Sequence, residues 1–266
     1  MKFEAHDAVV DLLKSVGAFQ LTHFRKVDED AVDMKAAKET VSFVDVESEK
    51  LLRKGFGEIL PEAGWYGEEL GQEGSQDLVW VVDPIDGTTN YLNGLDYFSI
   101  SIGLMYYGEV VYGIVYRPSN GEWISAKKGD GVMINGEKIA QVRQVASVAE
   151  ALFVTGFPYR SEDLNDAFFG AANEILRLGR GIRRNGSAAL DLAHAGMGWY
   201  GGFWESDLQP YDAAGAMAIM QEAGLTLTNH LGEPYRLFKD RILVAATPCV
   251  HAPLLAIVKK HYSPFL

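Results

Sequence analysis

Residues 78–82 constrain the fold of this chain more than any other segment. They read Leu-Val-Trp-Val-Val, five apolar residues with no polar residue between them. A strand with one solvated face alternates apolar and polar side chains, whereas a strand covered on both faces reads as a continuous apolar run. We therefore predict a strand at 78–82 that is buried on both faces of its sheet.

Helical and strand-like patterns precede this strand. Apolar residues within 9–20 recur at three- and four-residue spacings, which predicts an amphipathic helix. Residues 41–44 are typical of a strand that ends at Asp45, and a second helix is expected to end at Pro61. Residues 64–77 are rich in glycine and glutamate and are expected to form a loop.

The middle of the chain is expected to form an antiparallel meander. Strand candidates at 98–104 and 110–116 precede the dipeptides Asn120-Gly121, Asp130-Gly131 and Asn135-Gly136, which favour tight hairpin turns. The pattern restarts at residue 151, so we predict an N-terminal half, 1–146, and a C-terminal half, 147–266. In the second half we expect strands at 152–155 and 202–205, and helices at 163–177, 190–195 and 212–224.

Charge and cysteine content limit the possible partners. Lys and Arg total 24 against 36 Asp and Glu, which gives a formal net charge of −12. Such a surface repels phosphate backbones and disfavours nucleic acid as a partner. Carboxylates gathered around a divalent cation would contribute to this acidity, so an anionic substrate stays admissible. The single cysteine, Cys249, excludes an intrachain disulfide and favours a reducing cytoplasm.

No segment is typical of a secretory signal or a membrane span. The first seven residues carry two acidic side chains without an apolar stretch behind them. The most apolar late segment, 242–258, is interrupted by Pro248, His251 and Pro253. We expect a soluble, cytoplasmic protein with no membrane partner.

The predicted strand leads directly into Asp83-Pro84-Ile85-Asp86-Gly87. Pro84 fixes its own φ, and Asp86-Gly87 favours a sharp turn. This geometry can bring two carboxylates and the Ile85 carbonyl into one small space, and Mg²⁺ prefers such oxygen ligands. A helix that begins after Gly87 would offer free N–H groups to a phosphate. From spacing alone, a plain turn is an equally good interpretation.

Three further segments carry acidic residues. Glu68 and Glu69 lie in the glycine-flanked loop, Asp45 ends the earlier strand, and Asp212 opens the late helix. Each has an ordinary structural explanation: a solvated pair, a strand terminus and a helix cap. Taken one at a time, these explanations are better than a functional one.

Taken together, the segments resemble the inositol monophosphatase family. Residues 80–91 (Trp-Val-Val-Asp-Pro-Ile-Asp-Gly-Thr-Thr-Asn-Tyr) are similar to its first signature. Residues 211–215 (Tyr-Asp-Ala-Ala-Gly) are similar to its second, in which Trp usually precedes the Asp, and 183–191 resemble a substrate-facing segment of bacterial members. The resemblance implies an α/β (α+β) fold, a layered α-β-α-β-α sandwich of the sugar-phosphatase type, in a homodimer.

The resemblance also implies a site for two to three Mg²⁺ ions. The implied metal ligands are Glu68, Asp83, the Ile85 carbonyl, Asp86 and Asp212. The implied catalytic residues, which help to activate water, are Asp45, Glu68 and Thr88. The implied substrate-binding residues are Asp86, Gly87, Thr88, Ala188 and Glu205.

The implied reaction is hydrolysis of a phosphomonoester by a metal-activated water, with myo-inositol monophosphate as the first choice of substrate. Histidinol phosphate, a fructose bisphosphate and a 3′-phosphorylated adenosine nucleotide are alternatives within the same chemistry. A regulatory protein that binds transcription machinery is an alternative of another class. The full set of acids favours an enzyme, because a binding module does not need to hold mutually repelling carboxylates together. An extra charge at Asp207 is expected to alter the rim that contacts the substrate.

Overall fold

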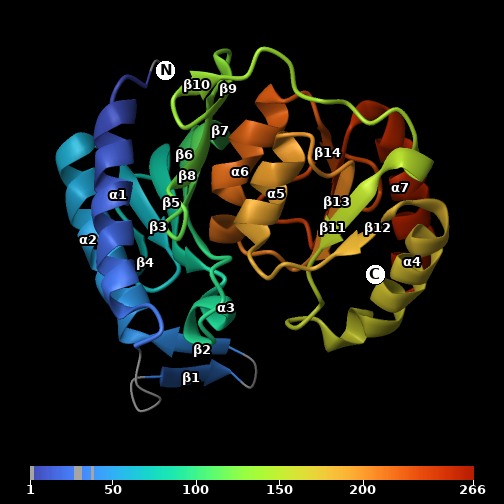
Figure 1. Ribbon diagram of the computed structural model, residues 1–266, viewed down its shortest axis with the longest axis horizontal. Coiled ribbons are helices and arrows are strands. Elements are labelled where there is room, and N and C mark those ends of the chain that lie inside the picture. The colour runs from blue at the N-terminus through green and yellow to red at the C-terminus, as the bar shows by residue number, and fades with distance from the viewer. Residues whose placement is uncertain (1–2, 27–31, 37–38) are drawn as a thin grey trace.

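Helices and sheets alternate in five layers across the molecule (Figure 1). The structure, a computed structural model, describes residues 3–26, 32–36 and 39–266. An eight-stranded sheet and a five-stranded sheet enclose one pair of helices, and a further pair covers the outer face of each sheet. This arrangement confirms the predicted α-β-α-β-α sandwich.

Within the described residues, the α-helices form three pairs and one short helix. The outer pair on the eight-stranded sheet is α1 (His6–His23) and α2 (Phe43–Ile59), the central pair is α5 (Ala188–Gly196) and α6 (Pro210–Glu222), and the outer pair on the five-stranded sheet is α4 (Asn165–Leu178) and α7 (Pro248–Tyr262). The short helix α3 (Thr88–Leu92) follows β5 (Leu78–Asp86), an interior strand of the eight-stranded sheet. Among the residues that the structure describes, every helix is too short or too polar to cross a bilayer.

The eight-stranded sheet has the order β10-β9-β8-β7-β6-β5-β3-β4. Its strands are β3 (Gly64–Gly67), β4 (Gly71–Glu73), β5 (Leu78–Asp86), β6 (Ser99–Tyr106), β7 (Glu109–Arg117), β8 (Glu122–Lys127), β9 (Gly131–Ile134) and β10 (Glu137–Lys138). From β5 to β10, each strand pairs antiparallel with the next one in the sequence, which confirms the predicted meander. Asn135 and Gly136 both adopt positive φ between β9 and β10, as expected for a tight hairpin.

The five-stranded sheet has the order β12-β11-β13-β15-β14. Its strands are β11 (Leu152–Thr155), β12 (Gly181–Arg183), β13 (Gly202–Ser206), β14 (Thr226–Thr228) and β15 (Ile242–Ala246). Strand β11 runs parallel to β12 and β13, whereas β15 is antiparallel to β13 and β14. A separate antiparallel pair is formed by β1 (Val32–Ala36) and β2 (Glu39–Ser42), and two short 3₁₀ helices span Val148–Glu150 and Glu162–Leu164.

Strand β5 is buried on both faces, as its apolar run predicted. Trp80 and Val82 belong to the core beneath α1 and α2, whereas Val79 and Val81 belong to the core shared with α6. Successive side chains of a strand point to opposite faces, so each face of β5 contributes to a different core. Strand β5 is thus packed on both faces up to the point where its acidic residues begin.

Two local predictions were wrong. Asp45 does not end a strand, because helix α2 already begins at Phe43 and places Asp45 in its first turn. An acidic side chain there interacts favourably with the helix dipole. Residues 64–77 are not only a loop, because they contain β3, which pairs in parallel with β5, and β4.

Candidate active site

The end of β5 opens into a cavity of about 440 Å³. Its walls combine β5, the loop that follows β11, and the first turns of α5 and α6. The walls include nearly all of the predicted site residues: Glu68, Asp83, Ile85, Asp86, Gly87, Thr88, Ala188, Glu205 and Asp212. The fold therefore brings together residues that are far apart in the sequence.

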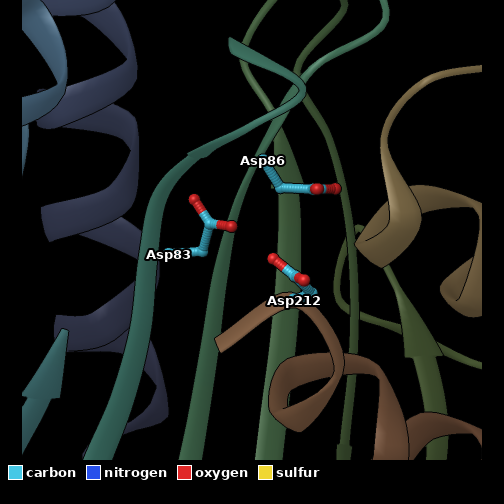
Figure 2. A group of neighbouring side chains, drawn as sticks. All are labelled: Asp83, Asp86 and Asp212. Atoms are coloured by element: carbon cyan, nitrogen blue, oxygen red, sulfur yellow. The ribbon is translucent and has the colours of Figure 1, made fainter. Parts of the chain in front are cut away.

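Three buried carboxylates face one another at the cavity (Figure 2). Asp83 and Asp86 come from β5 and Asp212 from the first turn of α6, and each offers an oxygen within 4.8 Å of the others. Their exposed fractions are only 2%, 7% and 6%. Such a cluster is costly for a protein unless a cation or protons compensate it.

An irregularity in β5 places Asp83 and Asp86 on the same side. Residues three apart on a regular strand point to opposite faces. Here Asp83 pairs with Ser101 and Asp86 with Ser99, so three steps along β5 match two along β6. This extra residue is a bulge, and Pro84, which has no N–H to donate, lies within it.

The electrostatics of the cluster fit a divalent cation. Burial and the charges of Glu68 and Asp86 hold the pKa of Asp83 well above its ordinary value. Burial and the charge of Asp212 raise the pKa of Asp86 to about 7, against hydrogen bonds that lower it. Asp83 Oδ1 is buried and accepts no hydrogen bond from the residues that the structure describes. A divalent ion would satisfy this oxygen and relieve the repulsion.

The carboxylate of Asp86 is held by the N-terminus of α5. Its Oδ2 accepts hydrogen bonds from the Ser187 hydroxyl and from the Ala189 N–H at 2.8 Å, and its Oδ1 accepts one from the Ala188 N–H at 3.2 Å. Free N–H groups at a helix start favour an anion in this position. The Ala188 N–H, predicted to bind substrate, thus donates to Asp86 in this structure.

The carboxylate of Asp212 belongs to a capping box at the start of α6. Its Oδ2 accepts a hydrogen bond from the Gln209 N–H at 2.8 Å. The same oxygen pairs with Arg160 Nη1 at 3.0 Å. A guanidinium group therefore already balances part of the charge of the cluster.

The turn after Asp86 has the predicted geometry. Gly87 has a φ of 96°, which favours glycine, and α3 begins at Thr88. The Thr88 hydroxyl donates a hydrogen bond to the Ile85 carbonyl oxygen at 2.9 Å. This contact fixes the Thr88 side chain beside the carbonyl that the sequence pointed to as a metal ligand.

Asp45 is the one predicted site residue that is not part of the described cavity wall. It is 1% exposed in the first turn of α2. Its charge nevertheless contributes to the raised pKa of Asp83. Asp45 is therefore buried within electrostatic range of the cluster.

Glu205 lies on the far wall of the cavity, near the end of β13. Burial and the charge of Asp212 raise its pKa well above the ordinary value, while Arg184 lowers it. Gly156 leaves room for this side chain, since a Cβ on Gly156 would lie 1.9 Å from Glu205 Oε1. The residue that follows β11, Gly156, therefore packs directly against the Glu205 carboxylate of β13.

Sequence reasoning missed the loop after β11. Arg160, Phe157 and Tyr159 from this loop line the cavity, and the Arg184 guanidinium lies 5.5 Å and 5.0 Å from the centres of the two aromatic rings. The strand at 152–155 was predicted, but its parallel pairing with β13 was not. That pairing brings the loop beside Glu205, and only the tertiary fold reveals it.

Asp207, which was expected to alter the rim, is not itself part of the described cavity wall, although its neighbours Ser206 and Leu208 are. Its carboxylate accepts hydrogen bonds from Arg241 Nε at 2.8 Å and Nη2 at 2.7 Å, and from the Ser161 hydroxyl. The extra charge is paired with Arg241, the residue that precedes β15.

The five-layer fold and the buried acidic cavity are typical of a metal-dependent phosphatase. The chain belongs to the inositol monophosphatase family, whose model matches residues 3–263. "Nus factor SuhB" of Pseudomonas aeruginosa is 34% identical over 95% of both chains, and "Fructose-1,6-bisphosphatase/inositol-1-monophosphatase" of Aquifex aeolicus is 32% identical over 90% of this chain and 89% of its own. Among solved structures, an IMPase of Thermotoga maritima is similar with a TM-score of 0.88 and 30% identity, over 98% of both chains.

Proposed function

We propose that this protein hydrolyses a small phosphomonoester with the help of Mg²⁺, and that myo-inositol monophosphate is the preferred substrate. The observation that carries this proposal is the convergence of Asp83, Asp86 and Asp212 at one cavity. Membership of the inositol monophosphatase family supports the reaction class. The metal-ion requirement follows from the cost of keeping three buried carboxylates together.

The metal ligands in this proposal are Glu68, Asp83, the Ile85 carbonyl, Asp86 and Asp212, for two to three ions. When bound, Mg²⁺ would lower the pKa of a water molecule and neutralise the phosphoryl oxygens. The protein supplies the rigid frame for this chemistry. Hydrogen bonds from α5 hold Asp86, and the capping box of α6 holds Asp212.

The proposed catalytic groups are Asp45, Glu68 and Thr88. The Thr88 hydroxyl would orient the attacking water by accepting a hydrogen bond from it, and a carboxylate, Glu68 or Asp45, would accept its proton. Glu68 and Thr88 line the cavity, and Asp45 is buried in the first turn of α2, outside the described cavity wall. The contact of Thr88 with the Ile85 carbonyl supports a fixed orientation of its hydroxyl.

The proposed substrate-binding residues are Asp86, Gly87, Thr88, Ala188 and Glu205. The Gly87 and Thr88 N–H groups would bind the phosphate at the start of α3, and Glu205 would bind a ring hydroxyl. The Ala188 N–H, which donates to Asp86 in this structure, would bind a second hydroxyl by sharing its hydrogen in a three-centre bond. A cavity of about 440 Å³ suits a small ring rather than a polymer. The dual name of the Aquifex aeolicus relative supports a fructose bisphosphate as the first rival substrate, ahead of histidinol phosphate and 3′-phosphorylated adenosine nucleotides.

The oligomeric state and the division of the chain are also part of the proposal. We expect a cytoplasmic homodimer. Within each subunit, the N-terminal and C-terminal halves of the chain meet near residue 147, and each half is built around one of the two large sheets. Light scattering during gel filtration measures the oligomeric state. A monomer at micromolar concentration would contradict the dimer without affecting the chemistry.

A screen of phosphate release tests the function. The purified protein is incubated with inositol monophosphates, histidinol phosphate, fructose bisphosphate and 3′-phosphoadenosines, with Mg²⁺ or with a chelator. We expect Mg²⁺-dependent release that is highest for an inositol monophosphate, and its loss in Asp83→Asn and in Asp212→Asn with an unchanged far-UV CD spectrum. Retained activity in either variant contradicts the proposed metal site.

A second candidate function is binding to transcription machinery. The name of the Pseudomonas aeruginosa relative, "Nus factor SuhB", is the observation that favours it. Recovery of RNA polymerase with the tagged protein, together with no hydrolysis of any phosphate in the screen, would favour this function over the enzyme.

A further inference from the structure

A buried carboxylate outside the cavity wall contacts the segment that carries Glu68. Glu49 lies on α2 and is 0% exposed. Its Oε2 accepts a hydrogen bond from the Glu69 N–H at 2.6 Å. Its Oε1 accepts hydrogen bonds from the Leu70 N–H at 3.0 Å and from Trp65 Nε1 at 2.9 Å.

These three donors lie on both sides of Glu68. Trp65 precedes it in β3, while Glu69 and Leu70 follow it on the way to β4. The N–H of Glu68 itself donates to the Val82 carbonyl at 3.3 Å, one residue before Asp83. The backbone around Glu68 is therefore connected to α2 on one side and to the end of β5 on the other.

Gly67 shows how closely this segment approaches the carboxylate. A Cβ on Gly67 would lie 1.8 Å from Glu49 Oε1 and 2.5 Å from its carboxyl carbon. Real Cβ atoms do not approach other heavy atoms to such distances, so a larger residue would displace either the carboxylate or the segment. Only glycine leaves enough room at position 67 for the Glu49 carboxylate, so the backbone and this carboxylate are closely packed.

The same helix carries Asp45, four residues before Glu49. Residues four apart lie on one face of a helix, and both side chains are buried. Simple packing of α2 on the sheet is already supplied by apolar residues such as Leu52 and Phe56. A buried acid adds a desolvation cost that apolar packing would avoid, so its hydrogen bonds to the Glu68 segment need another explanation.

We propose that Glu49 is a positioning residue that fixes the Glu68 carboxylate relative to the carboxylates of β5 and to Asp45. This inference rests on the proposed function, because Glu68 is a proposed metal ligand. Groups that orient a metal ligand without touching the metal commonly change metal affinity or activity by about 10- to 100-fold when they are removed.

Glu49→Gln is the direct test. The side chain keeps its size, but an NH₂ group replaces one oxygen and cannot accept a hydrogen bond from the Glu68 segment. We expect the Mg²⁺ concentration for half-maximal activity to rise about 10- to 100-fold. The Mg²⁺ concentration that gives half of the maximal increase in melting temperature should rise by the same factor. This second titration measures Mg²⁺ binding without turnover.

Two control variants separate positioning from general destabilisation. Glu47→Gln changes an exposed acid on the same helix, which pairs with Lys50, and should leave Mg²⁺ binding unchanged. Trp65→Phe removes the indole donor and some buried ring volume, but leaves both backbone bonds from the Glu68 segment. It should lower the melting temperature while the Mg²⁺ dependence stays at the wild-type value.

A double variant tests whether Glu49 acts through Glu68. In Glu68→Gln the proposed ligand is already lost, so adding Glu49→Gln should weaken Mg²⁺ binding no further. Independent, multiplying effects would overturn the inference. If Glu49→Gln does not fold, Gly67→Ala replaces it, because its Cβ would displace the same carboxylate and should weaken Mg²⁺ binding in the same way.

The outcomes distinguish this inference from the proposed function. If the wild-type protein shows no Mg²⁺-dependent stabilisation or activity, the proposed function fails. If the wild type binds Mg²⁺ and the variant at Glu49 binds it equally well, only the positioning role fails. Weaker binding in Glu49→Gln, wild-type binding in Trp65→Phe and a non-additive double variant together establish it.

Discussion

The carboxylate of Asp86 accepts a hydrogen bond from the hydroxyl of Ser187, a residue 101 positions further along the chain. Ser187 is also the N-cap of α5, where its side chain accepts a hydrogen bond from the Leu190 N–H. One hydroxyl therefore joins the acidic turn of the first sheet to the central helix pair. This connection places the acidic cluster between the two sheets.

Removal of the Ser187 hydroxyl should shift the pH dependence of activity. The bond to Ser187 lowers the pKa of Asp86, so Ser187→Ala should raise that pKa, and protons will compete better with Mg²⁺. We expect the acid limb of the kcat/KM profile to move upward by up to about one pH unit, equivalent to about 1.4 kcal/mol. Ser187→Thr keeps a hydroxyl and should restore the profile. An acid limb that stays in place in Ser187→Ala would contradict this role.

The metal-free protein should lose stability as the pH rises. Asp86 has a pKa of about 7 in the folded protein against 3.8 as its ordinary value. Between these values the folded state binds more protons than the unfolded state, so the free energy of unfolding falls with rising pH. With a chelator, the melting temperature should fall from pH 5 to pH 8. Excess Mg²⁺ should reduce or reverse this trend, and a metal-free protein that becomes more stable toward pH 8 would contradict it.

Replacement of Arg160 should strengthen the binding of Mg²⁺. Arg160 pairs with the buried Asp212, and its side chain is 37% exposed. Arg160→Gln removes a cation that competes with Mg²⁺ for the cluster, so Mg²⁺ should bind several-fold more tightly. The metal-free protein should lose about 1 kcal/mol or less, because solvent screens a partly exposed pair.

Arg241→Gln is the matched control for this prediction. Arg241 pairs with Asp207, which does not line the cavity. This variant should also lose some stability, but its Mg²⁺ titration, followed by melting temperature, should match the wild type. Equal Mg²⁺ affinity in both arginine variants would show that Arg160 does not compete with the metal.

Local sequence patterns predicted the elements that carry strong periodicity. The apolar run at 78–82 predicted β5, and the strand predicted at 152–155 coincides with β11. The short strands β3 and β4 were missed because their three or four residues owe their conformation to pairing with each other and with β5. The helix that begins at Phe43 was placed too late, since its first turn contains β-branched valines that favour strands in isolation.

The same distinction applies to the candidate site. Asp83, Asp86 and Asp212 were identified in advance because each occurs in a motif that resembles a family signature. Arg160 belongs to no such motif, and its approach to Asp212 depends on a loop that follows a parallel strand pair. Residues brought into a site by tertiary pairing leave no local pattern in the sequence.

Glu205 should determine affinity for substrate hydroxyls without affecting the metal. Its carboxylate lies in the cavity, outside the three-carboxylate cluster. Glu205→Gln replaces one carboxyl oxygen with an NH₂ group and so removes an acceptor, and a typical hydrogen bond contributes about 0.5–1.5 kcal/mol. We therefore expect KM for an inositol monophosphate to rise by about two- to tenfold, with an unchanged Mg²⁺ requirement.

Gly156→Ala should also raise KM for an inositol monophosphate, because the added Cβ would displace the Glu205 carboxylate. Its Cβ would lie 1.9 Å from Glu205 Oε1 and would push the carboxylate away from its present position. Both variants should hydrolyse p-nitrophenyl phosphate, which has no ring hydroxyls, with the wild-type KM. If both substrates are affected equally, Glu205 acts on the phosphate or the metal, and the hydroxyl-binding role is wrong. If only the hydroxylated substrate is affected, comparing several sugar and cyclitol phosphates in these variants identifies which hydroxyl Glu205 binds.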